Sequence, residues 1–164
     1  MLDRIKRAWW LRRLKDPTYA FLGEAYGGDE LVRIDFETTG LDVRTDQLLS
    51  VGAIKVQGDT ILTSQRLDFL IRPAHPVSER TILVHHIRPV DLATAVPIDE
   101  AIPRVLEFIG PRPLIGYYLE FDLGMLNKYV RPLIGAMMPN GMRRIAARNG
   151  TQVSTMMRPT TLPR

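Results

Sequence analysis

Cysteine is absent from this sequence of 164 residues. Without cysteine the chain forms neither a disulfide nor a thiolate metal site, so oxygen or nitrogen ligands must hold any metal that it binds. No apolar run approaches the ~20 residues that span a bilayer, and the N-terminus lacks the continuous apolar segment of a signal peptide. These absences lead us to expect a cytoplasmic protein with no membrane span.

Acidic residues and histidine are missing from the end of the chain. After Asp122 the sequence contains seven Lys and Arg residues but no Asp, Glu or His. Residues 1–122 carry 15 basic and 18 acidic side chains, a net charge of −3, so the overall charge of +4 combines an acidic body with a basic end. A basic end can bind polyanions such as nucleic acid, but we favour the alternative of a solvated or non-native end.

The length suits one domain with its own core and is too short for two. Hydrophobic residues make up 45% and charged residues 24%, as in ordinary globular proteins. We expect a basic helix and linker over residues 1–30 and a folded domain over residues 31–135. Residues 136–164 show neither strand nor helix periodicity, so we expect a disordered or non-native basic tail.

Basic and apolar side chains alternate through residues 2–15, which predicts a short basic helix. Such a helix could contact nucleic acid or an acidic membrane surface. We favour the alternative that its tryptophans dock on the domain, because Trp is usually buried over most of its surface. Residues 23–30, with two adjacent glycines, resemble a linker.

The apolar pattern of the domain predicts three strands followed by a helix, a strand and a helix. In the first strand Val32, Ile34 and Phe36 share one face, which is strand periodicity. The expected strands cover residues 31–37, 48–56, 61–71 and 113–117, the expected helices cover residues 98–109 and 120–133, and a Pro-rich loop covers residues 72–97. This order indicates an α/β domain with a mixed sheet.

Two carboxylates, Asp35 and Glu37, share the other face of the first strand. Same-face neighbours lie ~6.6 Å apart at the backbone, close enough to approach one divalent cation from either side. Without a cation they would repel each other, and their hard oxygens favour Mg²⁺ or Mn²⁺. The following Thr38, Thr39 and Gly40 offer hydroxyls and a flexible turn for a sugar or phosphate. An acidic outer strand face is the alternative, which we favour less because carboxylates are depleted in strands.

Asp122 lies in a helical stripe that is otherwise apolar, so it is expected to point toward the sheet. A buried carboxylate needs a partner or a metal. The alternative is a capping role near the start of the helix.

Two segments resemble the motifs of the DEDD-type 3′–5′ exonucleases, a family that includes the proofreading epsilon subunit of bacterial DNA polymerase III. Residues 35–40 (D-F-E-T-T-G) match the first motif, D-x-E-T-T-G, and Leu41 is similar as well. Residues 114–122 (L-I-G-Y-Y-L-E-F-D) are similar to the apolar strand and G-H-N-x-x-F-D turn of the second motif, with two tyrosines in place of His-Asn. Residues 84–87 (V-H-H-I) resemble the V-H-G-I stretch between these motifs.

The resemblance implies a ribonuclease H-like fold and hydrolysis of DNA from its 3′ end with two Mg²⁺ or Mn²⁺ ions, in replication or repair, with a DNA polymerase as a candidate partner. It implies that the catalytic metal ligands are Asp35, Glu37 and Asp122. The substrate-binding residues that it implies are Thr38, Thr39, Gly40, Leu41, His85, Tyr117 and Phe121. A loop histidine is as often structural, so both interpretations of His85 stay open.

The family's third motif, H-x-x-x-x-D or Y-x-x-x-D, has no counterpart after Asp122, and Tyr129 is followed by no Asp. We therefore expect a fold that is incomplete at its C-terminal side and an impaired exonuclease. The alternative is a catalytically inactive module that binds nucleic acid or associates with a polymerase.

Overall fold

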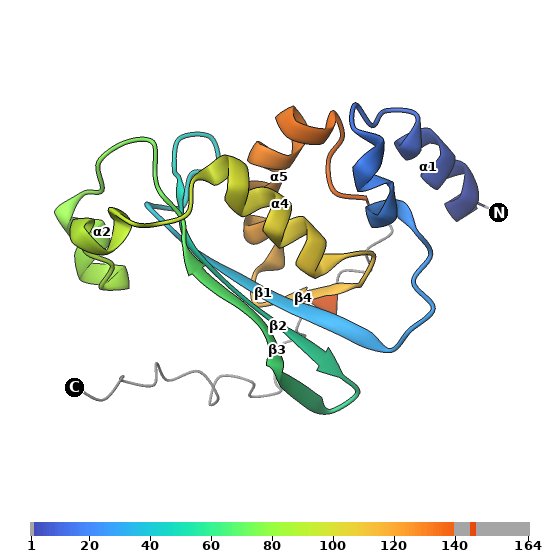
Figure 1. The fold of residues 1–164 in the computed structure, drawn as a ribbon, viewed down its shortest axis with the longest axis horizontal. Coiled ribbons are helices and arrows are strands. Elements are labelled where there is room, and N and C mark those ends of the chain that lie inside the picture. Colours follow the sequence, from blue (N-terminus) through green and yellow to red (C-terminus); the bar gives the residue numbers. More distant parts are fainter. Residues whose placement is uncertain (1, 140–144, 147–164) are drawn as a thin grey trace.

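The computed structural model describes residues 2–139 and 145–146, and Figure 1 shows how their helices and strands are arranged. The strands are β1 (Glu30–Thr38), β2 (Leu48–Gln57), β3 (Thr60–Leu70), β4 (Leu114–Gly116) and β5 (Ile145–Ala146). The helices are α1 (Leu2–Leu11), the 3-10 helix η1 (Pro17–Gly23), α2 (Glu79–His85), α3 (Pro89–Leu92), α4 (Ile98–Ile109) and α5 (Leu119–Ile134). The predicted α/β class is confirmed.

The strands form one mixed sheet in the order β3-β2-β1-β4-β5. β1 pairs with β2, and β2 with β3, in antiparallel fashion, whereas β4 is parallel to both β1 and β5. Gly58 adopts a positive φ of 55° between β2 and β3, as a tight hairpin turn requires. β1 therefore lies in the middle of the sheet, with a long partner on one side and a partner of three residues on the other.

The core forms between one face of the sheet and the helices α4 and α5, which lie over that face (Figure 1). Val32, Ile34 and Phe36 of β1 are buried against it, as the alternation predicts. The apolar stripe of α4 is buried along its length, at Ala101, Ile102, Val105, Leu106 and Ile109. Because side chains alternate along a strand, Asp35 and Glu37 are left on the opposite face.

Residues 72–97 are not the plain loop that we expected, because they contain the helices α2 and α3. The helix α2 has seven residues, too few for a 3.6-residue period to show in the sequence. Its start is fixed by Ser78, whose Oγ accepts a hydrogen bond from the Thr81 N–H at 3.3 Å. This helix places His85 beside the end of β1.

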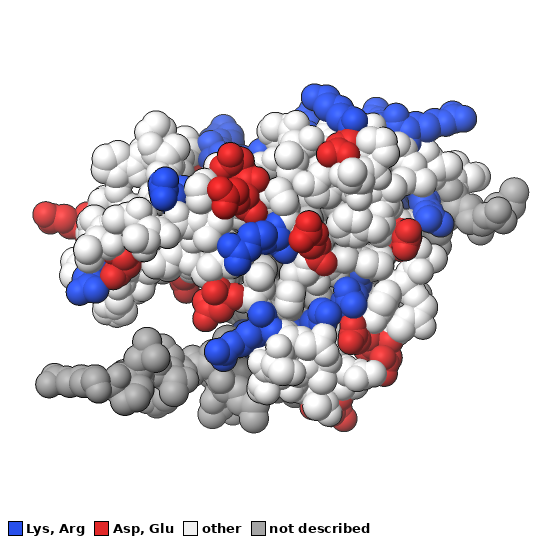
Figure 2. Space-filling view, in the orientation of Figure 1, with Lys and Arg blue, Asp and Glu red and all other residues white. Residues whose placement is uncertain are grey.

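The helix α1 docks on the domain through one of its two tryptophans. Trp10 is 9% exposed, and its Nε1–H donates to the Met137 carbonyl at 2.7 Å. Trp9 is 58% exposed, with the Arg13 guanidinium 3.7 Å from the centre of its ring. Figure 2 shows Lys and Arg side chains grouped over α1, at the upper right. The predicted docking of α1 on the domain is thus confirmed for Trp10, and the side of α1 that carries Trp9 is exposed to solvent.

Packed residues continue beyond both expected domain boundaries. Residues 17–23 form η1, between the expected helix at residues 2–15 and the expected linker at residues 23–30, and Ala136 and Met138 are buried in the main core. β5 pairs with β4 at residues 145–146. The remainder of the expected tail, residues 140–144 and 147–164, lies outside the described residues. Within the described ranges, no helix is both long and apolar enough to cross a membrane.

We expect Trp10→Ala to lower the free energy of unfolding by about 3–5 kcal/mol, because it removes a buried ring and its hydrogen bond. The matched control Trp9→Ala removes an exposed ring and should cost less than about 1 kcal/mol. Urea unfolding followed by circular dichroism measures both. Equal losses in the two variants would contradict the docking of α1 through Trp10.

Candidate active site

Two acidic residues stand near the C-terminal end of β1. Asp35 lies opposite Gly52 of β2, and Glu37 lies opposite Ser50, so the neighbouring strand places only small side chains beside the two carboxylates. Asp35 is exposed, yet the atoms packed around its carboxyl group displace enough water to raise its pKa above the usual value. The two residues form an acidic surface next to small neighbours.

Asp122 reaches this strand from the first turn of α5. The Val32 N–H donates to the Pro113 carbonyl on the β4 side, and alternation directs the Phe36 N–H to the same side. Because β4 pairs with β1 only at Val32 and Arg33, no strand faces Phe36 there. Asp122 Oδ1 accepts a hydrogen bond from the Phe36 N–H at 3.1 Å, where a neighbouring strand would otherwise supply a carbonyl.

Asp122 is 4% exposed, and its pKa is raised to about 7. The largest cause is loss of water around the carboxyl group, and the negative charges of Asp35 and Glu37 raise the pKa further. The hydrogen bond from Phe36 acts in the opposite direction. Asp35 and Glu37, the other two predicted metal ligands, are therefore close enough to raise the pKa of Asp122.

His85, at the end of α2, forms an ion pair with Glu37 through Nδ1 and Oε2. The next residue, His86, adopts a left-handed conformation with φ of 57° that ends the helix. The structure thus brings His85 to the carboxylates, although 47 residues separate it from Glu37 in the sequence. The pairing places an imidazole ring at the acidic surface.

The turn after β1 uses its hydroxyl groups to hold itself together. Thr38 Oγ1 donates to the Gly40 carbonyl at 2.7 Å, and Thr39 Oγ1 donates to Asp46 Oδ1 at 2.7 Å. A Cβ atom at Gly40 would lie 2.6 Å from Asp46 Oδ2, so only glycine fits there. Leu41 follows with its side chain exposed.

Sequence reasoning missed two residues that position this turn. Asp46 binds Thr39 and also accepts the Asp42 N–H at 2.8 Å. Thr81 Oγ1 donates to the Thr39 carbonyl at 3.1 Å and thereby joins α2 to the turn. The only sequence signal for Thr81 is its position three residues after Ser78, which is a helix-capping spacing. The apolar pattern of the sequence gives no indication of the role of Asp46.

Aromatic side chains border the start of α5 next to Asp122. Tyr117 and Tyr118 are 82% and 71% exposed. Tyr118 has a φ of 54°, an uncommon conformation for a bulky residue. Its ring stacks on that of Phe121 with 6.4 Å between centroids and 11° between planes. Tyr118 was not among the predicted site residues, because nothing in the sequence shows its exposure.

The side chains around β1 match the ligand preferences of a hard cation but are not gathered into one coordinating group. No set of three or more His, Cys, Asp or Glu residues within residues 2–139 has the arrangement of a metal site. Asp122 is bonded to Phe36 and Glu37 is paired with His85. Carboxylate oxygens nevertheless suit Mg²⁺ or Mn²⁺, and a cation would offset the repulsion that raises the pKa of Asp122.

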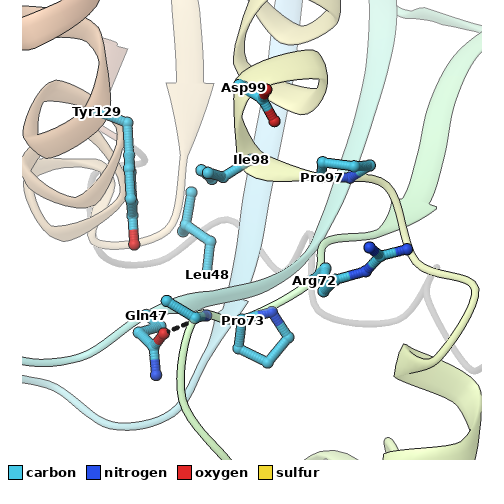
Figure 3. Close-up of a pocket in the computed structure, with 9 residues that line it drawn as sticks. Gln47, Leu48, Arg72, Pro73, Pro97, Ile98, Asp99 and Tyr129 are labelled. Atoms are coloured by element: carbon cyan, nitrogen blue, oxygen red, sulfur yellow. Dashed lines mark hydrogen bonds between the residues drawn. The ribbon is translucent and has the colours of Figure 1, made fainter.

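A separate cavity of about 220 Å³ lies between α5, the start of α4, the start of β2 and the segment that follows β3 (Figure 3). Its lining includes Gln47, Arg72, Asp99 and Tyr129, and none of the predicted site residues. Gln47 Oε1 accepts the Ala74 N–H at 2.6 Å at its edge. The cavity thus adjoins the segment that holds Thr39, but the acidic surface lies elsewhere.

Comparison with known proteins relates this chain to components of bacterial DNA polymerase III. Over 104 residues it is 31% identical to the DNA polymerase III subunit epsilon of Aquifex aeolicus, covering 63% of this chain and 50% of that protein. Over 110 residues it is 29% identical to the PolC-type DNA polymerase III of Thermotoga maritima, covering 67% of this chain and 8% of that protein. The chain therefore spans half or less of the length of these two relatives.

Solved structures of exonuclease I share the fold. A product-bound exonuclease I superposes with a TM-score of 0.57 at 19% identity, covering 63% of this chain and 26% of that one. E. coli exonuclease I in complex with a dT13 oligonucleotide gives a TM-score of 0.56 at 19% identity, over 63% and 24% of the two chains. The predicted ribonuclease H-like fold is confirmed.

The family model described as Exonuclease (RNase T) matches residues 32–163, most of the chain, and continues past the predicted domain end at residue 135. The motifs on β1 and α5 that suggested DEDD nucleases lie within this match. The chain belongs to the RNase T family of DEDD-type 3′–5′ exonucleases and resembles the epsilon subunit of DNA polymerase III.

Proposed function

We propose that this chain is a metal-dependent 3′–5′ exonuclease that acts on phosphodiester bonds at the 3′ ends of DNA, and that its activity is impaired because residues 123–164 contain no third motif of the family. The observation that carries the proposal is the convergence of Asp35, Glu37 and Asp122 at the end of β1, where the two strand carboxylates raise the pKa of the buried one. Structural ion pairs rarely leave three acidic groups together without a matching cation, whereas nuclease sites require this arrangement.

Asp35, Glu37 and Asp122 would hold the two Mg²⁺ or Mn²⁺ ions. Such ions lower the pKa of an attacking water and stabilise the leaving oxygen in phosphoryl transfer. The Phe36 N–H fixes one oxygen of Asp122, and the pair with His85 fixes one oxygen of Glu37. These contacts restrict the rotamers of two ligands before substrate arrives, which reduces the entropy cost of assembling the site.

The apolar side chains around the carboxylates, of which Leu41 and Tyr117 are exposed and Phe121 is half-buried, suit a frayed 3′ end. Leu41, Tyr117 and Phe121 can contact the bases, because every base offers an apolar face for stacking. The turn at Thr38, Thr39 and Gly40 would approach the sugar and phosphate with backbone groups, since its hydroxyls already hold the turn. His85 would contact the substrate only after leaving Glu37.

A second candidate is an inactive module that binds DNA 3′ ends or a polymerase. The observation that favours it is the lack of any Asp, Glu or His after Asp122 to supply a third-motif base or ligand. A polymerase partner, and with it a role in replication, is suggested by the relatives that are named as DNA polymerase III components. Activity measurements separate the two candidates.

Asp35→Ala and Glu37→Ala should each remove most of the Mg²⁺ affinity while the fold is kept, because each deletes a carboxylate from the acidic surface. Isothermal titration calorimetry with MgCl₂ measures the affinity. Asp59→Ala, which removes an exposed carboxylate from the turn between β2 and β3, is the control and should bind as the parent does. Parental affinity in either site variant would rule out these ligands.

In EDTA, stability should fall as the pH rises from about 4 to about 7. The pKa of Asp122 is about 7 in the folded state, and its usual value of 3.8 applies to the unfolded state. Between these two values the folded state binds more protons, so the free energy of unfolding decreases as the pH rises. Asp122→Asn keeps the acceptor for Phe36 and should flatten this slope, by up to about 4 kcal/mol across the range. Urea unfolding at several pH values tests this, and an unchanged slope would refute a buried titrating Asp122.

We expect the chain to release little nucleotide from a 3′-labelled single strand with Mn²⁺, and an extended chain that carries a family third motif to be active. A positioned base contributes ~10²–10⁴-fold, and ~1 Å of misplacement of the site costs ~10²-fold. Asp35→Ala in both chains is the control for contaminating nuclease. Nuclease-like turnover by the unextended chain that Asp35→Ala abolishes would show that no third motif is needed.

A further inference from the structure

We infer that α1 and the turn after it form a binding site for single-stranded nucleic acid, separate from the catalytic carboxylates. The site would take the phosphate backbone on its Lys and Arg side chains and a base on Trp9. It concerns binding alone and holds whether or not the chain hydrolyses its ligand.

The positive charge of the folded part is concentrated on this segment. Residues 1–15 contain six basic residues and one acidic residue, a net charge of +5, whereas residues 16–122 contain nine basic and 17 acidic residues, a net charge of −8. The exposed basic residues here are Lys6, Arg7, Arg12, Arg13 and Lys15. A phosphate backbone is bound by such cations, which release its counterions, and the acidic body cannot provide them.

An aromatic side chain lies among these cations. Trp9 is exposed beside Ile5, one helical turn earlier, and the Arg13 guanidinium covers its ring. Single-strand binding sites combine a basic surface with aromatic rings and Arg planes on which bases stack.

The segment is held rigidly by its inner side. The Trp10 ring is buried, and its Nε1–H bonds to Met137. The Lys15 N–H donates to the Ile134 carbonyl at 2.8 Å, which fixes the end of the turn on α5. The basic residues and Trp9 are therefore presented by an ordered element, and little ordering entropy is lost on binding.

A membrane surface suits this helix less well. A helix that lies in a bilayer interface needs a wide apolar face opposite its charged face. Here Trp10 is turned into the protein, and Ile5 and Trp9 are the only large apolar side chains that α1 exposes among those described. Two apolar groups among many cations fit alternating bases and phosphates better than lipid chains.

The position of α1 suits contact with nucleotides that lie several positions away from the 3′ end of a bound nucleic acid. In Figure 1, α1 lies on the side where β1 begins, whereas α2 lies beside the end of β1, where His85 pairs with Glu37. A strand of nine residues spans about 26 Å. A nucleic acid whose 3′ end reaches the carboxylates would therefore meet α1 only if it extends several nucleotides further.

The test is fluorescence anisotropy of labelled oligothymidylates of about 20 and about 4 nucleotides with the full chain in EDTA. The variants are Trp9→Ala, with Trp9→Phe as its conservative match, and a combined Lys6→Gln, Arg7→Gln, Arg12→Gln and Arg13→Gln chain. Arg66→Gln, an exposed basic residue on β3, is the control. Circular dichroism confirms that each variant folds.

For the long oligonucleotide we expect Trp9→Ala to weaken binding about 5-fold or more, with Trp9→Phe retaining most of the affinity. The combined variant should lower the slope of log affinity against log salt by up to about 2.8, since each lost phosphate contact removes ~0.7. The short oligonucleotide should bind the parent more weakly than the long one, because it contacts fewer cations, and Arg66→Gln should show no change.

Unchanged affinity and salt slope in both α1 variants would overturn the proposal. It would also be overturned if α1 variants lost binding to vesicles of phosphatidylserine and phosphatidylcholine but bound the oligonucleotide as the parent does. Because EDTA prevents metal-dependent hydrolysis, these outcomes are independent of whether the chain is an active exonuclease.

Discussion

The hydrogen bond from the Phe36 N–H to Asp122 joins α5 to β1 at the point where β4 no longer pairs with it. A buried N–H left without a partner would cost ~1–3 kcal/mol, so the end of a short strand creates a need for an acceptor. A carboxylate at the start of α5 meets that need and is placed beside Asp35 and Glu37 by the same contact. The geometry of the acidic site thus follows from completing the sheet.

The position of Asp122 beside β1 is electrostatically unfavourable. Asp122 is buried beside two other acidic residues, and its pKa rises to about 7 as a result. A group in this state destabilises the fold when it ionises, unless positive charge arrives. His85 provides a partner for Glu37 but does not contact Asp122. Strained or unfavourable arrangements of this kind are retained where function needs them, and a site that requires cations explains this one most simply.

The elements that could be predicted from the sequence are those with a periodic apolar pattern or a match to a known motif. The alternation of Val32, Ile34 and Phe36 assigned the faces of β1 correctly, and the stripe of α4 was long enough to show a helical period. The contacts of Asp46 and Thr81 with Thr39 could not be predicted, because they depend on how irregular segments fold back in space. The same holds for Tyr118, whose left-handed conformation and exposure leave no periodic signal.

The distribution of charge separates the acidic surface on β1 from the basic helix α1. Fields from exposed charges decay over ~8 Å at physiological ionic strength, while β1 alone spans about 26 Å. The cations on α1 therefore cannot neutralise Asp35, Glu37 and Asp122, which need cations of their own. What α1 can do is hold a polyanion near the domain and so raise the local concentration of its end at the acidic surface. The acidic surface on β1 and a basic helix at a distance from it are thus compatible, because attraction of a polyanion and charge balance at the carboxylates act over different distances.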